Sequence, residues 1–461
     1  MKMIFDVGDK PKAGQLVVFA LQQMLAILAA TIAVPMIIGN GLTPSAAMFG
    51  AGVGTLVYVF FTKRQSPVFL GSSFAFIGSM SAAFAGGVSM QLGMLGLLIG
   101  TCAAALVYVL IALLIAKVGV GWVNKLMPPV VIGPTVAIIG LSLAGNAVSD
   151  LNKSNAVQLE GTNYAAVFCG LITLFVTFLC STYGKRLLKL IPFVVGIIAG
   201  YFAAGTMTII GFAYDIDELK LIDAGVFERM MLDGGISAKS FFCLPDFVFL
   251  KAASGFRELN ATYVMTILVA YIPVAFVVFA EHVADHKNLS SVIGRDLLKE
   301  PGLTRTLLGD GIGSAAGAFF GGCPNTTYGE SVGCVAITRN ASIVTIIAAA
   351  IGCMLLSFFT PFVAFISSIP SCVMGGVCIA LYGFIAVSGL KMLQKVDLDK
   401  NRNLFTASVI LITGIGGLSL SFGSVTLTEV AAALILGIIT NVMLSEEPAP
   451  EKTAENTEKT D

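Results

Sequence analysis

The stretch CPNTTYGE, residues 323–330, interrupts an apolar part of the chain with a proline, polar residues and a glycine. A second stretch, SPVFLGSSF at residues 66–74, also has a proline followed by a glycine and contains polar residues. The segments that contain them, 67–85 and 324–338, are the third and the tenth of fourteen candidate membrane spans. Interrupted segments in matching places of two halves point to a transporter's binding site near the bilayer midplane. Because each half has seven spans, an odd number, the second half must be inverted.

These two stretches therefore predict the fold. We expect an all-α polytopic membrane protein of fourteen segments, arranged as two inverted seven-segment repeats. The third and tenth segments should be discontinuous, with short extended stretches. Non-helical backbone at that depth survives only where it is buried in protein or lines a cavity.

The composition is that of a membrane protein throughout its length. The 461 residues are 56% hydrophobic and 12% charged, whereas a soluble domain carries about 25% charged residues. The formal net charge is zero, so there is no basic surface for nucleic acid. The nine cysteines are scattered without a CxxC pair, which gives no indication of a metal or redox site.

The distribution of charge predicts the orientation. With fourteen spans and both termini in the cytoplasm, the inside loops and tails hold 21 of the 27 Lys and Arg residues, as the positive-inside rule expects. Five of the other six lie in one long outside loop, 213–259, and long loops are exempt from that rule. The acidic tail 446–461 contains no large apolar residue, and we expect it to be disordered.

Two carboxyl groups carry the functional prediction. Glu281 and Glu330 lie in apolar stretches, and no Lys or Arg lies in the interior of a predicted span. A carboxylate at such depth must take up a proton or bind hydrogen-bond donors. Asp285 follows Glu281 by one helical turn, so the two favour shared protonation. These residues predict the movement of a polar solute together with a proton.

Other polar positions have structural and functional interpretations of similar weight. Gln22 and Gln23 in the first span would bond to neighbouring helices or contact the solute. Phe74, which follows Ser72 and Ser73, would be a core residue or a stacking wall for a planar ring.

The remaining titratable residues favour structural roles. His282 and His286 are the only histidines, and we interpret them as part of the wetted end of the eighth span, at 260–285. Asp310 would cap a helix or pack between helices.

The run Asn325–Glu330, followed by Gly333 and by residues 336–339, resembles the signature of the nucleobase–ascorbate transporter family in its uracil permease form. Residues 71–76 and 280–282 match that family's third and eighth spans. The similarity covers the chain up to the acidic tail.

The resemblance implies a core domain of spans 1–4 and 8–11 and a gate domain of spans 5–7 and 12–14. The expected division is a cytoplasmic N-terminal tail at 1–13, core at 14–117, gate at 118–212, the outside loop at 213–259, core at 260–367, gate at 368–445 and the cytoplasmic tail at 446–461.

The resemblance also implies a function. It implies a homodimer in a bacterial plasma membrane that imports uracil, with the proton as coupling ion and no cofactor. The carboxylates of Glu281 and Glu330 would accept hydrogen bonds from the ring N–H groups, and the backbone amides of Phe74 and Gly329 would serve the ring oxygens. Supporting residues would be Gln22, Gln23, Ser72, Ser73, Asn325, Thr326 and Tyr328.

Two departures from the family pattern affect this interpretation. The family has Gln-His in the first span, where this chain has Gln22-Gln23. Some members carry a His where this chain has Asp285, so the proton route would use a Glu281–Asp285 pair.

Several alternatives remain open at this point. The solute could be another nucleobase, such as xanthine or thymine, or uptake could be passive. Anion carriers share this architecture but would want a basic or neutral site. An intramembrane aspartyl protease would use Asp285 and Asp310, but Leu307 replaces the first glycine of its Gly-x-Gly-Asp motif.

Overall fold

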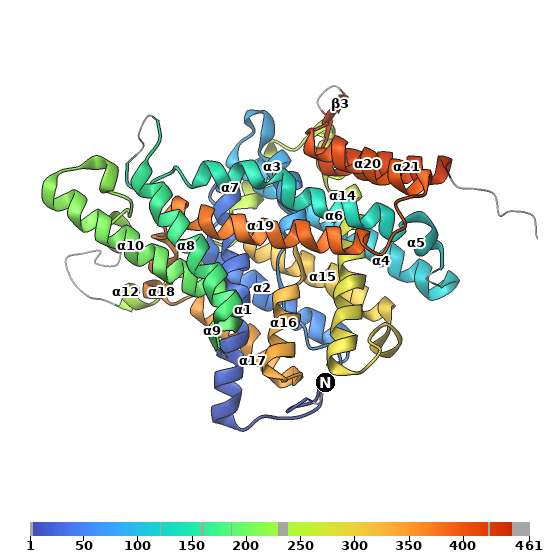
Figure 1. The fold of residues 1–461 in the computed structure, drawn as a ribbon, viewed down its shortest axis with the longest axis horizontal. Helices are drawn as coiled ribbons and strands as arrows, with labels where there is room; N and C mark the ends of the chain where they lie inside the picture. The colour runs from blue at the N-terminus through green and yellow to red at the C-terminus, as the bar shows by residue number, and fades with distance from the viewer. Residues whose placement is uncertain are drawn as a thin grey trace, which may run out of the picture.

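The computed structural model describes residues 3–119, 121–157, 161–185, 187–228, 238–422 and 425–444. The described residues are mostly helical, and their strands form two short antiparallel pairs (Figure 1). The tail predicted at 446–461 lies outside the described residues.

The longer helices are α1 (Ala13–Ile38), α2 (Pro44–Phe61), α4 (Met90–Val118), α6 (Pro129–Ser142), α8 (Tyr164–Tyr183), α10 (Pro192–Tyr214), α14 (Ala261–Ile293), α15 (Leu303–Gly321), α16 (Gly329–Thr338), α17 (Ile343–Leu356), α19 (Ser371–Leu393), α20 (Asn401–Ile415) and α21 (Glu429–Met443). The shorter elements include η1 (Phe74–Phe76), α3 (Ile77–Ala83), η2 (Ala85–Gly87), α5 (Gly121–Leu126), α7 (Ala144–Asp150), α9 (Leu187–Leu190), α13 (Val248–Ala252) and α18 (Thr360–Ser367). The strands are β1 (Leu70–Ser72), β2 (Asn325–Thr327), β3 (Leu420–Phe422) and β4 (Val425–Leu427).

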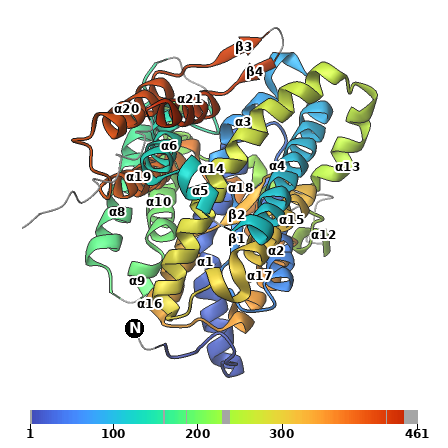
Figure 2. The same cartoon turned by 90° about the vertical axis from the view of Figure 1, so that its right-hand side faces the viewer.

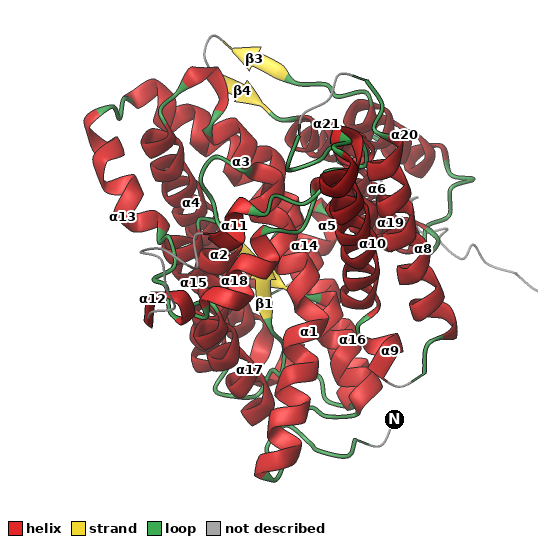
Figure 3. Ribbon diagram, turned by 90° about the vertical axis from the view of Figure 1, so that its left-hand side faces the viewer, coloured by secondary structure: helices red, strands yellow, loops and turns green. Residues whose placement is uncertain are grey.

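Within the described chain, eight helices are long and apolar enough to cross a membrane. Three shorter apolar helices, at Phe74–Gly87, Ile343–Leu356 and Glu429–Met443, accompany them. The segment predicted as one span at 341–367 is divided into α17 and α18. The β3–β4 hairpin, which has no counterpart in the sequence expectations, lies at one edge of the molecule (Figure 3).

The helices pack as two groups. Helices α2, α4, α15 and α17 pack together with α1 and α14, whereas α6, α8, α10 and α19 pack together with α20 and α21. Figure 2 shows the first group around α2, α4 and α15 on the right and the second group on the left. Helix α14 also contacts α6 and α21, so it lies at the boundary between the groups.

Strands β1 and β2 pair with each other deep inside the first group (Figures 2 and 3). Leu70, Gly71 and Ser72 lie opposite Thr327, Thr326 and Asn325 in an antiparallel register. All six residues are buried. The pairing satisfies backbone groups that would otherwise be unpaired inside a membrane. The extended stretches predicted in the third and tenth segments are therefore present.

Side chains of the first group anchor this strand pair. The amide nitrogen of Leu70 donates to Oγ1 of Thr55 at 2.9 Å, and Nδ2 of Asn325 donates to the carbonyl of Gly50 at 3.1 Å. Gly71 has no room for a side chain, since a Cβ there would lie 2.3 Å from the ring of Tyr328. Both strands are thus held by helix α2.

Ser331 joins three elements of the strand region. Its Oγ accepts a hydrogen bond from the amide of Phe69 at 2.9 Å and another from Nε2 of Gln23. The three residues belong to α16, to the segment before β1 and to α1. Ser331 and Gln23 are almost fully buried, so water cannot easily replace these bonds.

We expect Ser331→Ala to lower the free energy of unfolding by about 1–3 kcal/mol, because it leaves two buried donors without an acceptor. Thermal unfolding of the purified protein measures the change. Thr338→Val is the matched control, since the Thr338 hydroxyl donates only to the carbonyl of Cys334 in the same helix. Equal stability of the two variants would contradict the linking role of Ser331.

Candidate functional site

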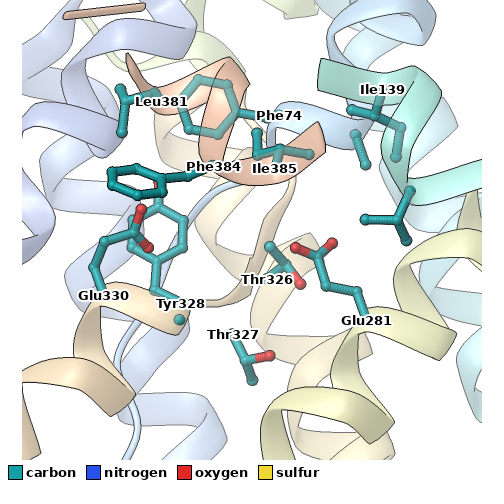
Figure 4. Close-up of a pocket in the computed structure, with 13 residues that line it drawn as sticks. Phe74, Ile139, Glu281, Thr326, Thr327, Tyr328, Glu330, Leu381, Phe384 and Ile385 are labelled. Carbon is teal, nitrogen blue, oxygen red and sulfur yellow. The ribbon is translucent and has the colours of Figure 1, made fainter. Parts of the chain in front are cut away.

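A cavity with an empty volume of about 550 Å³ lies between the two groups of helices (Figure 4). It is lined by Phe74 and Ala75 of η1, Val136 and Ile139 of α6, Glu281 of α14, Thr326 and Thr327 of β2, Tyr328, Gly329 and Glu330 at the start of α16, and Leu381, Phe384 and Ile385 of α19. The two interrupted segments and α14 thus form the polar wall, and α6 and α19 form an apolar wall.

Two carboxyl groups enter the cavity from different helices. Figure 4 shows Glu281 and Glu330 on either side of Thr326 and Tyr328. The described residues that line the cavity include no Lys, Arg or His. The charges of Glu330, Asp285 and Asp310 lie within electrostatic reach of Glu281. These carboxyl groups therefore repel one another when ionised, and the cavity walls offer no basic side chain to offset them.

Two helices have their N-termini at the same cavity. Helix α16 begins at Gly329 after an extended Tyr328, and η1 begins at Phe74 after an extended Ser73. The first N–H groups of a helix lack acceptors within the helix. The expected meeting of two half-helix N-termini is thus present, and it places backbone donors beside the two carboxyl acceptors.

Several predicted supporting residues belong to the frame around the cavity. Ser73 donates its backbone N–H to the carbonyl of Pro324 at 2.8 Å, and the Ser72 carbonyl accepts from the Tyr328 hydroxyl at 2.7 Å. The side-chain amide of Asn325 donates a hydrogen bond to the carbonyl of Gly50. The backbone groups of Ser72 and Ser73 and the side chain of Asn325 thus help to position the strands, and none of these three residues lines the cavity.

The glutamines of the first span also lie outside the cavity lining. Gln23 of α1 donates a hydrogen bond to Ser331 of α16. This contact agrees with the interpretation that Gln23 bonds to a neighbouring helix. The Oε1 atom of Gln22 is buried without a hydrogen-bond partner among the described groups. Neither glutamine lines the space where a solute would bind.

Asp285 lies beside the cavity floor. Its Oδ2 accepts a hydrogen bond from Oγ1 of Thr327 at 2.9 Å, which ties α14 to β2. Thr327 lines the cavity, whereas Asp285 does not. Asp285 therefore contacts a residue of the cavity wall without lining the cavity itself.

The interpretation of the two histidines as a wetted helix end is wrong. Helix α14 continues to Ile293, well beyond the predicted end at 285. His282 and His286 are 0% and 1% exposed and face the interior of the first group. Lys287, which follows His286, lies on the exposed face of a helix that continues.

The apolar wall could not be found from the sequence. Leu381, Phe384 and Ile385 look like ordinary residues of an apolar helix, and so do Val136 and Ile139. Phe384 is held edge-on against Phe193 of α10, with ring centroids 5.8 Å apart. Only the packing of the two groups brings this wall to face the carboxyl groups.

The arrangement suits a small planar ring with both donors and acceptors on its edge. It does not form an aspartyl protease dyad. Asp285 binds Thr327, whereas Asp310 binds His282 at 2.8 Å, so the two aspartates are engaged by different partners. A protease dyad requires two carboxyl groups that share a proton.

Comparisons with known proteins agree with this architecture. A family model described as "Permease family" matches residues 14–421. The chain is 38% identical over 468 residues to the uracil permease of Bacillus subtilis, covering 99% of this chain and 98% of that protein. It is 34% identical over 436 residues to the uracil permease of Escherichia coli, covering 94% and 92%.

Solved structures share the fold at low sequence identity. The transmembrane domain of the cyanobacterial bicarbonate transporter BicA aligns with a TM-score of 0.61 at 15% identity, covering 93% of this chain and 97% of that one. The murine solute carrier 26 family member A9 anion transporter aligns with a TM-score of 0.65 at 10% identity, covering 94% and 68%.

The family match spans most of the chain, and the relatives match along nearly their whole length. They are permeases, which move solutes across membranes and are not enzymes. The repeated apolar helices agree with a multi-pass membrane protein. We conclude that this chain belongs to the permease family.

Proposed function

We propose that the chain is a uracil:proton symporter that imports uracil by alternating access. One observation carries the proposal: two carboxyl groups and two helix N-termini meet in one cavity between two groups of helices. The names of the relatives support uracil as the solute.

Uracil has two ring N–H groups and two carbonyl oxygens. In this proposal, Glu281 and Glu330 accept hydrogen bonds from the N–H groups, and the backbone amides of Phe74 and Gly329 donate to the oxygens. The ring of Phe74 covers one face of the base. All four polar groups of uracil are then satisfied, so the loaded site loses most of its desolvation penalty.

The proton enters the cycle at Glu281. On the outside, a protonated Glu281 allows uracil to enter beside Glu330 without two bare carboxylates in one cavity. On the inside, where proton activity is lower, Glu281 releases its proton toward Asp285 and the cytoplasm, and uracil leaves. Uracil and the proton therefore bind cooperatively.

The finer architecture also belongs to this proposal. The chain crosses a bacterial plasma membrane fourteen times as two inverted repeats, with both termini in the cytoplasm, and forms a homodimer. The first group of helices acts as the core and the second as the gate, which their separate packing supports. The cavity lies between them, so a movement of one group against the other would open it to either side.

Uptake of labelled uracil by cells that express the chain tests the proposal directly. We expect faster uptake at acidic than at alkaline external pH, loss of accumulation with a protonophore, and competition by unlabelled uracil. Thymine and xanthine as competitors define the nucleobase range. Uptake that ignores both pH and protonophore would contradict proton coupling, and the absence of uracil uptake by correctly inserted protein would contradict the solute.

Glu330→Gln tests recognition of the solute. Glutamine keeps the shape but replaces a charged acceptor, so we expect uracil binding to weaken by about 2–3 kcal/mol through the loss of a charge-assisted hydrogen bond. Calorimetric titration of purified protein measures the effect. Glu258→Gln, at an exposed position outside the cavity, is the control. Unchanged affinity in Glu330→Gln would remove Glu330 from the binding site.

Glu281→Gln tests proton coupling separately from binding. We expect this variant to retain some uracil binding but to lose accumulation against a gradient, because the amide cannot carry the proton. Accumulation driven by an imposed pH gradient in proteoliposomes measures the effect. Proton-driven accumulation at the wild-type level would refute Glu281 as the carrier.

A further inference from the structure

A buried polar triad lies outside the cavity, between α14 and α15. Nδ1 of His282 is 2.8 Å from Oδ2 of Asp310, and Nε2 of the same ring is 3.0 Å from Oγ1 of Thr306. All three residues are 0% exposed, and none of them lines the cavity. His282 follows Glu281 in the sequence, but its ring is directed toward α15.

The hydroxyl of Thr306 has a second acceptor within reach. Its Oγ1 is 3.0 Å from the backbone carbonyl of Leu303. The hydroxyl hydrogen can therefore point either toward Nε2 of His282 or toward this carbonyl. A hydroxyl group can accept one hydrogen bond while it donates another, so the choice decides which ring nitrogen carries a proton.

Two hydrogen arrangements fit the same positions of the heavier atoms. In the first, Thr306 donates to Nε2, and Nδ1–H donates to an ionised Asp310. In the second, Thr306 donates to the Leu303 carbonyl, Nε2–H donates to Thr306, and a protonated Asp310 donates to Nδ1. The second arrangement holds one more proton than the first, and the net charge of the triad changes from minus one to zero.

We propose that His282, Asp310 and Thr306 form a proton-binding site, separate from the cavity carboxyl groups, which gains and loses one proton by switching the tautomer of His282. The proton is exchanged with water, and no covalent bond between heavier atoms changes. Besides the one proton that enters or leaves the triad, the switch requires rotation of one hydroxyl group and transfer of protons along existing hydrogen bonds. The site adds to the proposed symport but does not depend on the identity of the solute.

The surroundings provide no fixed counter-charge for Asp310. The titratable groups near the triad are Glu281, Asp285 and His286 of α14, Tyr58 of α2 and Tyr108 of α4. In the described chain, no Lys or Arg forms an ion pair with Asp310, and Arg305 on α15 is exposed.

One oxygen of the carboxyl group is left over in both arrangements. Oδ1 of Asp310 is buried without a hydrogen-bond partner among the described groups. The hydroxyl of Tyr108 is also buried without such a partner. An ionised Asp310 would therefore be a buried charge that is only partly solvated by its partners, whereas the protonated triad is neutral. A neutral acceptor would be enough for a purely structural hydrogen bond to His282. The presence of a buried carboxylic acid at this position therefore points to a role for its proton.

His286 provides an internal control. Its Nδ1 is 2.8 Å from the backbone carbonyl of His282, which can only accept a hydrogen bond. Nδ1 of His286 must therefore stay protonated whatever the pH, while its Nε2 faces the Tyr58 hydroxyl at 2.6 Å. The two rings lie 4.0 Å apart, so they experience similar burial but have different hydrogen-bond partners.

The chain contains only two histidines, so nitrogen NMR of protein labelled at histidine observes only these two rings. We expect one ring to change from Nδ1-protonated at alkaline pH to Nε2-protonated at acidic pH, and the other to keep a protonated Nδ1. This measurement uses the full wild-type chain without uracil. If neither ring changes tautomer over the pH range in which the protein stays folded, the proposal is overturned.

Two variants assign the switch to the triad. Asp310→Asn has no titratable proton at this position, so we expect the ring of His282 to keep one tautomer at every pH. Thr306→Ser retains the hydroxyl and should preserve the switch. A ring that still switches in Asp310→Asn would exclude Asp310 from the site. If that variant does not fold, the wild-type spectrum still decides the proposal.

The outcome is separable from that of the uracil experiments. A tautomer switch in a chain that does not transport uracil would support the proton site and remove the proposed solute. Proton-coupled uracil uptake without a switch would retain the symporter and remove this site.

Discussion

The antiparallel pairing of residues 70–72 with residues 325–327 is the contact on which the rest of the structure depends. Unpaired backbone groups are very unfavourable inside a membrane, so two interrupted segments must satisfy each other or be rebuilt as helices. Once they pair, the helices that follow them begin at the same place, and their free N–H groups face one cavity. The polar wall of the cavity is thus a consequence of how the two interrupted segments satisfy their backbone hydrogen bonds.

Contacts with the surrounding helices hold the strand pair in place. Thr55 and Asn325 tie the strands to α2, and Ser331 ties them to α1 through Gln23. These polar side chains could be taken for solute ligands in the sequence, yet their hydrogen-bonding capacity is used by the protein itself. Supporting contacts of this kind fix the positions of the groups that face the cavity.

In the described chain, carboxyl groups inside the helix bundle that have no Lys or Arg partner are the second organising feature. Glu281 and Glu330 line the cavity, Asp285 accepts a hydrogen bond from the cavity-lining Thr327, and Asp310 is buried beside His282. The described cavity walls offer no basic side chain to Glu281 and Glu330, whereas Asp285 and Asp310 have partners within the protein. Solved anion transporters share this fold at low sequence identity.

The sequence alone determined the membrane class, the paired interruptions, the extended stretches and the family, because hydropathy, prolines and a long local motif are readable without contacts. It also pointed to Glu281, Glu330 and Phe74, since carboxyl groups and a ring beside a break stand out in apolar segments. Only the tertiary structure decided that Leu381, Phe384 and Ile385 face them, because apolar wall residues look like any lipid-facing or core residue. It also decided that His282 and His286 are buried and that Gln23 serves Ser331, since hydrogen-bond partners hundreds of residues apart are chosen by packing and leave no local pattern.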